Sequence, residues 1–144
     1  MLNEDTIELS NVTISGNEAG KEGGGIHNTG ELTINNTTIY NNTTEGSGGG
    51  IYSVATTASV EVKNTIIAGN DSLVSGDDVE GTFTSQGHNL IGTRGTAVGF
   101  INGFNDDIVG SNAQHIDPFL SPLQDNGGPT LTHALLPGSP AIDA

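Results

Sequence analysis

Short groups of apolar residues recur along the first part of the chain at nearly constant spacing. In each group, two apolar residues stand two positions apart with a polar residue between them, which is the pattern of a strand that buries one face. The second group follows the first after 25 positions, and the third follows after a further 28. The three pairs are Ile7 and Leu9, Leu32 and Ile34, and Val60 and Val62. Each pair predicts a short strand.

Other positions of the repeat obey the same spacing. An isoleucine follows each pair, and an asparagine comes three positions later; these residues are Ile14 and Asn17, Ile39 and Asn42, and Ile67 and Asn70. A Gly-Gly-Gly-Ile segment occupies residues 23–26 and 48–51, and Gly-Asp-Asp-Val occupies residues 76–79. A fourth, less regular copy, His-Asn-Leu-Ile, spans residues 88–91. The glycine segments therefore mark turns of a repeat.

A repeat of this length indicates a stacked architecture. Helical repeats are disfavoured because Gly, Asn and Thr, which are poor helix formers, fill the segments. Three short strands in each repeat, around Ile26, around 32–34 and around Ile39, are typical of one coil of a parallel β-solenoid. Successive coils stack about 4.8 Å apart, so like residues form columns. We expect an all-β solenoid of three to four coils, with isoleucines stacked inside and asparagine amides bonded from coil to coil.

The repeats divide the chain into three consecutive parts of one domain. Coils are expected over 1–92, an irregular loop or an extra partial coil over 93–115, and a C-terminal cap over 116–144. The additional positions of the second repeat are expected in an enlarged loop over 54–58. Proline cannot donate to a strand ladder, so the five prolines of the last part should end the strands there. The apolar side of the cap is expected to comprise Phe119, Leu120, Leu123, Leu131, Leu135, Leu136 and Ile142.

Charge and composition exclude several classes of binding partner and of site. The net charge is -14, with 17 acidic residues against three Lys and Arg. Such a surface repels phosphate backbones and anionic lipid headgroups, which argues against nucleic-acid binding. The chain has no Cys, so it offers neither disulfides nor thiolate metal sites. It also lacks an apolar stretch near 18 residues, so no membrane span is expected in this segment. The first ten residues lack the features of a signal peptide and lead directly into a strand, which predicts a segment of a longer protein.

The repeat resembles that of a known family. The tetrapeptides at 14–17, 39–42 and 67–70 read Ile-x-x-Asn and alternate with Gly-Gly-Gly-Ile. This alternation resembles the repeat of polymorphic outer-membrane proteins and related bacterial surface β-helices. Residues 87–92 (GHNLIG) and 116–144 resemble the end of the β-helix region in large secreted bacterial proteins, where a surface-anchoring segment commonly follows. The resemblance implies a right-handed parallel β-helix that is extracellular or on a cell surface.

A rod of this kind favours a structural or adhesive role without a cofactor. Its function would be spacing, assembly, or binding of glycans or other surface proteins. The first coil would leave Ile7 and Leu9 beside unpaired strand edges. Further coils preceding residue 1 or a capping partner would cover this end. Alternatively, identical subunits would stack end to end, and because such a contact does not close, it would give a filament.

A competing hypothesis is a carbohydrate-active enzyme. Asp77 and Asp78 are followed by Gly-His at 87–88, and pectin-degrading hydrolases, which are also right-handed β-helices, use clustered Asp residues and a nearby Gly-His-Gly. Paired carboxylates supply the acid and the base of inverting hydrolysis. Here, however, Asn follows His88, and the Arg-x-Lys that holds the substrate carboxylate in that family is absent. The hydrolase hypothesis assigns catalysis to Asp77, Asp78 and His88. The alternative is that the two Asp form a solvated loop and that His88 is a turn residue.

Calcium and ice are two further candidate ligands. Oxygen ligands suit Ca²⁺, and the candidate ligands are Asp77, Asp78, Asp106 and Asp107. Neither the calcium-binding Gly-Gly-x-Gly-x-Asp repeat nor an EF-hand spacing is present, so charged loops are the simpler interpretation. Ice binding on a column of threonines is disfavoured because the columns that contain Thr37 and Thr38 are interrupted by valine and isoleucine.

Overall fold

The computed structural model describes residues 1–54 and 58–142, and this part of the chain contains strands, turns and loops but no helix. The enlarged loop expected over 54–58 falls largely on residues 55–57, outside the described residues. The strands are β1 (Leu2–Asn3), β2 (Thr6–Ser10), β3 (Thr13–Ser15), β4 (Glu18–Ala19), β5 (Ile26–Asn28), β6 (Glu31–Asn35), β7 (Thr38–Tyr40), β8 (Thr43–Thr44), β9 (Ile51–Ser53), β10 (Ser59–Lys63), β11 (Ile66–Ala68), β12 (Asp71–Ser72), β13 (Val79–Glu80), β14 (Thr84–Ser85), β15 (Leu90–Ile91) and β16 (Ile108–Val109).

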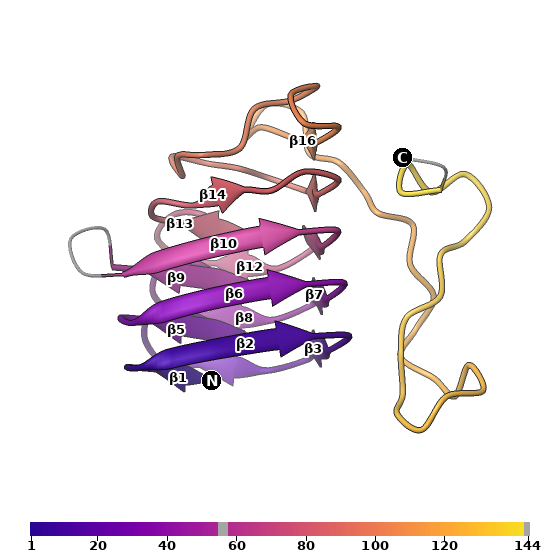
Figure 1. The fold of residues 1–144 in the computed structure, drawn as a ribbon, viewed down its shortest axis with the longest axis horizontal. Coiled ribbons are helices and arrows are strands. Elements are labelled where there is room, and N and C mark those ends of the chain that lie inside the picture. Colours follow the sequence, from indigo (N-terminus) through magenta and orange to yellow (C-terminus); the bar gives the residue numbers. More distant parts are fainter. Residues whose placement is uncertain (55–57, 143–144) are drawn as a thin grey trace.

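These strands form four parallel sheets, which are the sides of a coil and are named here after their first strands. The orders are β1-β5-β9-β13, β2-β6-β10-β14, β3-β7-β11-β15-β16 and β4-β8-β12. In Figure 1, β2, β6 and β10 run from left to right across the front, the chain returns behind them, and each coil lies above the last. The winding is therefore right-handed. The predicted all-β parallel solenoid is confirmed, with three complete coils and a partial fourth.

Strand pairing reproduces the alignment of the repeats. The inward-facing residues stack in trios, which are Ile7, Leu32 and Val60; Leu9, Ile34 and Val62; Ile14, Ile39 and Ile67; and Ile26, Ile51 and Val79. Each residue of the last trio follows a corner that contains glycine. Ile91 pairs with Ile67, which confirms the less regular fourth copy. The period of the sequence is thus the length of one coil.

Each complete coil has one more strand than the three predicted. These strands, β4, β8 and β12, are two residues long and mostly polar. They have no apolar alternation to reveal them, because a two-residue strand presents a single residue to each face. Hydrogen bonds between coils hold them in place, as where the Thr43 N–H donates to the Asn17 carbonyl at 2.8 Å.

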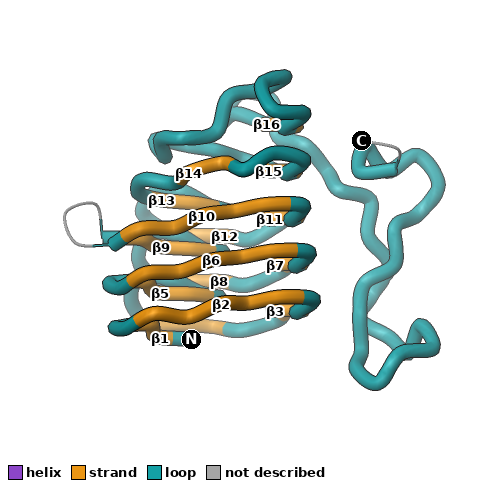
Figure 2. Tube along the Cα trace, viewed as in Figure 1, coloured by secondary structure: helices purple, strands orange, loops and turns teal. Residues whose placement is uncertain are grey.

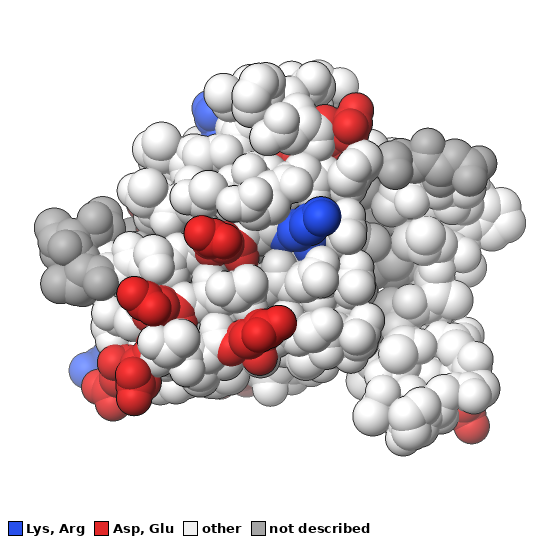
Figure 3. All heavy atoms as spheres, viewed as in Figure 1, with Lys and Arg blue, Asp and Glu red and all other residues white. Residues whose placement is uncertain are grey.

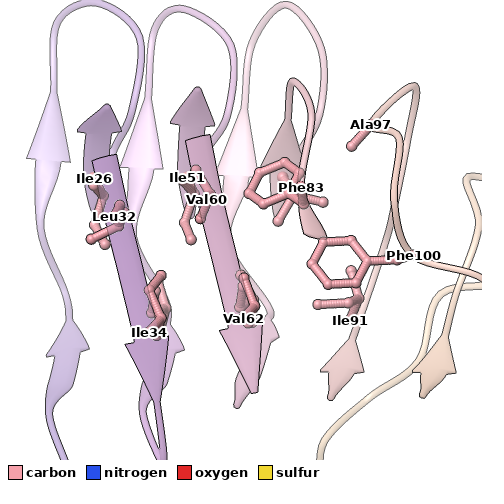
Figure 4. Close-up of a cluster of buried hydrophobic side chains, with 13 residues drawn as sticks. Ile26, Leu32, Ile34, Ile51, Val60, Val62, Phe83, Ile91, Ala97 and Phe100 are labelled. Carbon is pink, nitrogen blue, oxygen red and sulfur yellow. The ribbon is translucent and has the colours of Figure 1, made fainter. Parts of the chain in front are cut away.

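The core is a column of apolar side chains between the sheets (Figure 4). In the second and third coils these side chains are almost fully buried, as Ile39 (0% exposed) illustrates. At the C-terminal end, Phe83 and Phe100 fill the column, with ring centroids 5.2 Å apart. Ile7, Leu9 and Ile14 of the first coil are only partly buried. The core is therefore closed at one end and open at the other.

The corners explain the glycines and asparagines of the repeat. Between the β2 and β3 sheets, one residue per coil has a left-handed conformation, which asparagine tolerates better than most residues. The column comprises Asn11 (φ 58), Asn36 (φ 49), Asn64 (φ 48) and His88 (φ 56). At the corner before the β1 sheet, a Cβ on Gly25 would collide with the Gly50 carbonyl, and one on Gly50 would collide with the Asp78 carbonyl. Only glycine fits where another coil packs so closely.

The same geometry accounts for the altered third copy, Gly-Asp-Asp-Val. In the β1 sheet, β13 is the last strand, so no further strand stacks on its corner. A side chain then has room at the position that glycine must occupy in the two earlier coils. Asp78 takes that position with an exposed fraction of 2%.

The C-terminal part of the chain is irregular, as predicted, but it is placed differently from the expected cap. Residues 93–110 lie over the end of the coils, and 116–142, called here the strap, runs alongside them (Figures 1 and 2). Of the seven apolar residues expected on the cap's packed side, six are at least 40% exposed and Leu120 is half-buried. The strap contacts the outer face of one sheet, and most of its side chains lie in solvent. The domain boundaries at 92 and 115 stay a prediction.

Candidate functional site

The strap packs on the outer face of the β3 sheet. His133 holds it there, because its Nε2 lies 2.8 Å from Ser15 Oγ and its Nδ1 lies 2.7 Å from the Ser121 carbonyl oxygen. Nδ1 must donate to that carbonyl, so in the neutral ring Nε2 accepts from the Ser15 hydroxyl. The His133 ring also stands edge-on to Tyr40, with centroids 5.0 Å apart. Sequence reasoning assigned no role to His133, because its side-chain partner Ser15 lies 118 residues earlier in the chain.

Two grooves lie between the strap and the coils. The first has a volume of about 380 Å³, and its floor is the outward column of Ile66, Leu90 and Ile108. Leu135 of the strap lies across from this floor. The second groove has a volume of about 310 Å³. It is more polar and is lined by Tyr40, Asn70, Asp77, Asp78, Thr93, His115 and Asp117, among others.

Asp78 is the chemically unusual group of the second groove. Its Oδ1 accepts the backbone N–H and the side-chain Nδ2 of Asn70, both at 2.9 Å, and its Oδ2 accepts the Thr93 N–H at 2.6 Å. Burial raises the pKa of Asp78 from 3.8 to about 6, and the charge of Asp77 adds to the rise. The hydrogen bonds from Asn70 and Thr93 act in the opposite direction because they stabilise the carboxylate. Desolvation outweighs them.

Asp78 also ends the predicted asparagine ladder. The Nδ2 of Asn17 donates to Oδ1 of Asn42 at 2.8 Å, and the Nδ2 of Asn42 donates to Oδ1 of Asn70 at 2.9 Å. Asn70 then donates to Asp78. The expected bonding from coil to coil is confirmed, and the carboxylate replaces the amide that a further coil would supply.

Sequence reasoning missed a second ladder. Oδ1 of Asn89 accepts the Thr65 N–H at 3.1 Å, and Oδ1 of Asp107 accepts both the N–H of Asn89 at 3.0 Å and its Nδ2 at 3.1 Å. Asp107 is 2% exposed. A signal was present in the sequence, since Asn89 and Asp107 are each preceded by a corner residue. The loop between them, however, is shorter than a repeat, so alignment did not pair them.

The structure separates the residues of the hydrolase hypothesis. Asp77 and Asp78 line the second groove, whereas His88 lines the first. His88 occupies the corner column of asparagines, which supports its interpretation as a turn residue. Its nearest carboxylate partner is Asp106, with Nε2 and Oδ2 3.8 Å apart and both side chains well exposed.

The four candidate calcium ligands are likewise dispersed. Asp106 is exposed, while Asp107 points inward to its ladder and Asp77 accepts a hydrogen bond from the Ser72 hydroxyl at 3.1 Å. Within residues 1–54 and 58–142, no group of three or more His, Cys, Asp or Glu side chains is placed to hold a metal ion. Calcium binding stays a prediction from the sequence.

Acidic side chains also mark the front of the molecule. Figure 3 shows them spread over the face formed by β2, β6 and β10, with basic groups near its centre and at its margins. Glu8, Glu31 and Glu61 lie on these three strands, and Lys63 ends the third. A shallow groove of about 210 Å³ crosses this face. The face suits a neutral or cationic partner better than a polyanion.

No helix in the described part of the chain is long and apolar enough to cross a membrane.

Comparison with known proteins bears on the repeat itself. Residues 11–29 and 36–54 each match the sequence model of the Chlamydia polymorphic membrane protein repeat. Both matches begin at a corner asparagine, 25 positions apart, and run through Ile-x-x-Asn and Gly-Gly-Gly-Ile. Searches of curated proteins and of solved structures gave no match. The resemblance predicted from the sequence is confirmed by the matches and by the solenoid. The chain is a right-handed parallel β-solenoid, two segments of which are similar to the Chlamydia polymorphic membrane protein repeat.

Proposed function

We propose that the chain is a structural and adhesive module of a secreted or cell-surface bacterial β-helix protein. The observation that carries this proposal is that the repeat forms a rod whose coils are hydrogen-bonded to one another. Each coil is joined to the next by four strands and by buried amide ladders. Such a structure has few local openings and resists proteolysis. The family of the repeat is one of bacterial outer-membrane and surface proteins, which supports an extracellular location.

The adhesive part of the proposal rests on the strap. It exposes apolar side chains that the coils do not cover; they are Phe119, Leu123, Leu131, Leu135, Leu136 and Ile142. Exposed apolar groups of this kind, when they gather on one segment, are typical of binding surfaces. The first groove continues this surface onto Ile66 and Leu90. Glycans with apolar ring faces and neutral surface proteins are the partners that fit.

The test is binding of the immobilised chain to an array of glycans and to a panel of bacterial and host surface proteins. We expect retention of a defined subset, and a loss of about tenfold or more in affinity for the double variant Leu123→Ser and Leu131→Ser. Val98→Ser is the matched control, because Val98 is 61% exposed and lies outside the strap. Absence of binding, or equal binding by all three proteins, would refute adhesion through the strap. Limited proteolysis tests the structural part, which requires that residues 1–54 resist cleavage.

A second candidate function, glycan hydrolysis, is favoured by one observation. Burial raises the pKa of Asp78 to about 6, so its carboxyl would serve as the acid and the half-buried Asp77 beside it as the base. That division of roles is what a general acid and a base require. Against it, Asp78 is 2% exposed and both of its oxygens are engaged by Asn70 and Thr93.

An activity screen separates the two functions. The chain is incubated with pectin and with other plant and microbial glycans, and released reducing ends are measured. The structural module predicts no turnover. Turnover that is abolished in Asp78→Asn and retained in His88→Asn would favour a hydrolase built on the second groove.

A further inference from the structure

One outward-facing column of the β3 sheet changes from polar to apolar along the solenoid. It begins with Thr13 and Thr38, which are followed in register by Ile66, Leu90 and Ile108. A residue on the outer face of a solenoid meets water, so a polar side chain is expected there, as in the first two coils. Three consecutive apolar residues therefore indicate that this part of the face is covered or binds a partner.

The strap covers this apolar column only in part. Leu135 and Ala141 lie across from the column, and the first groove, of about 380 Å³, remains between them and the sheet. Ile66 and Ile108 are half-buried, and Leu135 is 40% exposed. A groove of this volume falls within the range of ligand sites in proteins.

A row of polar side chains runs along one edge of the groove. Asn64, His88 and Asp106 line it, and each stands two positions before an apolar residue of the column. All three have a left-handed conformation, with φ of 48°, 56° and 60°. The Asn64 N–H donates to the Gly87 carbonyl, one residue before His88, and the His88 N–H donates likewise one residue before Asp106. The polar row and the apolar column are therefore parallel, in steps of about 4.8 Å.

The polar row ends in a carboxylate. The side chain of Asp106 is 75% exposed, and its Oδ2 lies 3.8 Å from Nε2 of His88. In the described part of the chain no Lys or Arg lines this groove, and Lys63, the neighbour of Asn64 in the sequence, lines the front groove instead. The whole chain has a net charge of -14. The electrostatic field therefore favours a cation at the Asp106 end of the groove.

We propose that the first groove binds an extended segment of a partner protein that carries apolar side chains and one Lys or Arg. The apolar column is about 10 Å long, which three extended residues span. Alternate side chains of such a segment point to the same side, so two of them rest on the column. The basic side chain pairs with Asp106, and the Asn64 amide can bond to the backbone of the segment. This inference rests on the proposed adhesive role and names the chemistry of the partner.

A glycan fits this groove less well than a protein segment does. A sugar presents hydroxyl groups around its ring, and burying them against an aliphatic floor costs free energy unless each finds a hydrogen-bond partner. Thr65 and Asn89, the other polar lining residues, are buried and bonded within the protein. The polar groups that can meet a ligand thus lie along one edge only.

The experiment titrates the capped tetrapeptide acetyl-Leu-Ala-Leu-Lys-amide into the whole chain at low ionic strength, where exposed charges are least screened. NMR of the backbone amides reports binding. We expect saturable shifts confined to the residues that line the first groove. The peptide Ala-Ala-Ala-Lys lacks the apolar pair and should bind at least about tenfold more weakly. The peptide Leu-Ala-Leu-Glu reverses the charge and should bind at least about fivefold more weakly.

Two variants of the chain locate the site, and each has a matched control. Ile66→Thr introduces the residue that Thr38 supplies in the preceding coil, so the solenoid should keep its melting temperature while affinity for the Lys peptide falls at least about fivefold. Asp106→Asn should reduce the difference between the Lys and Glu peptides to about twofold or less. Val98→Thr and Asp125→Asn make similar changes at exposed positions outside the groove and should bind as the wild type does.

The proposal is overturned by an absence of saturable shifts, by shifts elsewhere on the molecule, or by equal binding of the Lys and Glu peptides. Methyl glycosides that shift the groove residues when the tetrapeptide does not would assign the groove to glycans instead. Adhesion through the strap is judged separately, on the glycan and protein arrays. Array partners held equally by the wild type and Ile66→Thr would keep adhesion and refute the groove as its site. A bound tetrapeptide without any array partner would refute adhesion and keep the groove.

Discussion

Oδ1 of Asp78 accepts both the backbone N–H and the side-chain Nδ2 of Asn70, each at 2.9 Å. In the preceding coil, Oδ1 of Asn70 accepts the same two groups of Asn42. A carboxylate thus occupies the position of an amide at the last step of a buried ladder. Its geometry suits the charged form, while its burial favours the neutral form, and the raised pKa of about 6 shows that burial prevails.

The pH dependence of stability follows from this shift. The folded pKa of about 6 lies above the ordinary value of 3.8, so the folded state binds the Asp78 proton more tightly than the unfolded state does. Stability from this proton is fully present below about pH 4 and is lost as the pH rises through 6. The free energy of unfolding should fall by about 3 kcal/mol across this window on account of Asp78. Denaturant titrations at pH 4 and pH 7 give the free energy of unfolding of the wild type and of Asp78→Asn. The contribution of Asp78 is the change, between the two pH values, in the difference between these two free energies.

Asp77→Asn is the control for that comparison. Asp77 is half-buried and raises the pKa of Asp78 only as a minor contribution. Its variant should keep most of the pH-dependent loss. If Asp78→Asn retains the same loss, another group is responsible.

The interior of the ladder should contribute more than its end. Asn42→Ala removes bonds to Asn17, Asn70 and the Ile14 carbonyl at a position that is 0% exposed. Leaving such buried partners unsatisfied should cost about 2–4 kcal/mol. Asn17→Ala, the same change at the exposed end, should cost less than about 1 kcal/mol. Equal costs in urea unfolding would mean that the ladder adds nothing beyond its backbone bonds.

His133 should control attachment of the strap. His133→Ala removes its contacts with Ser15, Ser121 and Tyr40. We expect proteases to cut within 116–142 at least about tenfold faster while the coils stay intact. His27→Ala is the control, since His27 makes a similar edge-on contact with Tyr52, at 5.2 Å, on another sheet. Strap cleavage that is unchanged by His133→Ala would show that other contacts hold it.

The corner column offers a test of His88. With φ at 56°, this residue shares the conformation of Asn11, Asn36 and Asn64. His88→Asn should therefore change the free energy of unfolding by no more than about 0.5 kcal/mol, whereas His88→Val should cost about 1–2 kcal/mol because a β-branched residue is strained there. Thermal unfolding compares the two variants. A large loss in His88→Asn would assign His88 a role beyond the turn.

The repeat could be predicted from the sequence because every coil requires the same type of residue at the same position. Ile7, Leu32 and Val60 are each apolar for the same local reason, and their spacing alone sets the register that the sheets adopt. The polar strand at Thr43–Thr44 could not be predicted, because two residues carry no period and hydrogen bonds to adjacent coils hold it. The ladder through Asn89 and Asp107 escaped for a related reason, since it crosses a loop shorter than a repeat.

The sequence by itself thus determined the coil, its period and its inward residues, since each depends on a pattern that recurs along the chain. Only the tertiary structure decided what happens once the pattern stops. The strap could have covered the end of the coils or their side, and contacts between residues as distant as Ser15 and His133 place it on the side. The replacement of glycine by aspartate at the third corner is likewise explained only by the three-dimensional structure. No further strand covers it, so Asp78 can enter the space of a missing asparagine, and burial there sets its pKa.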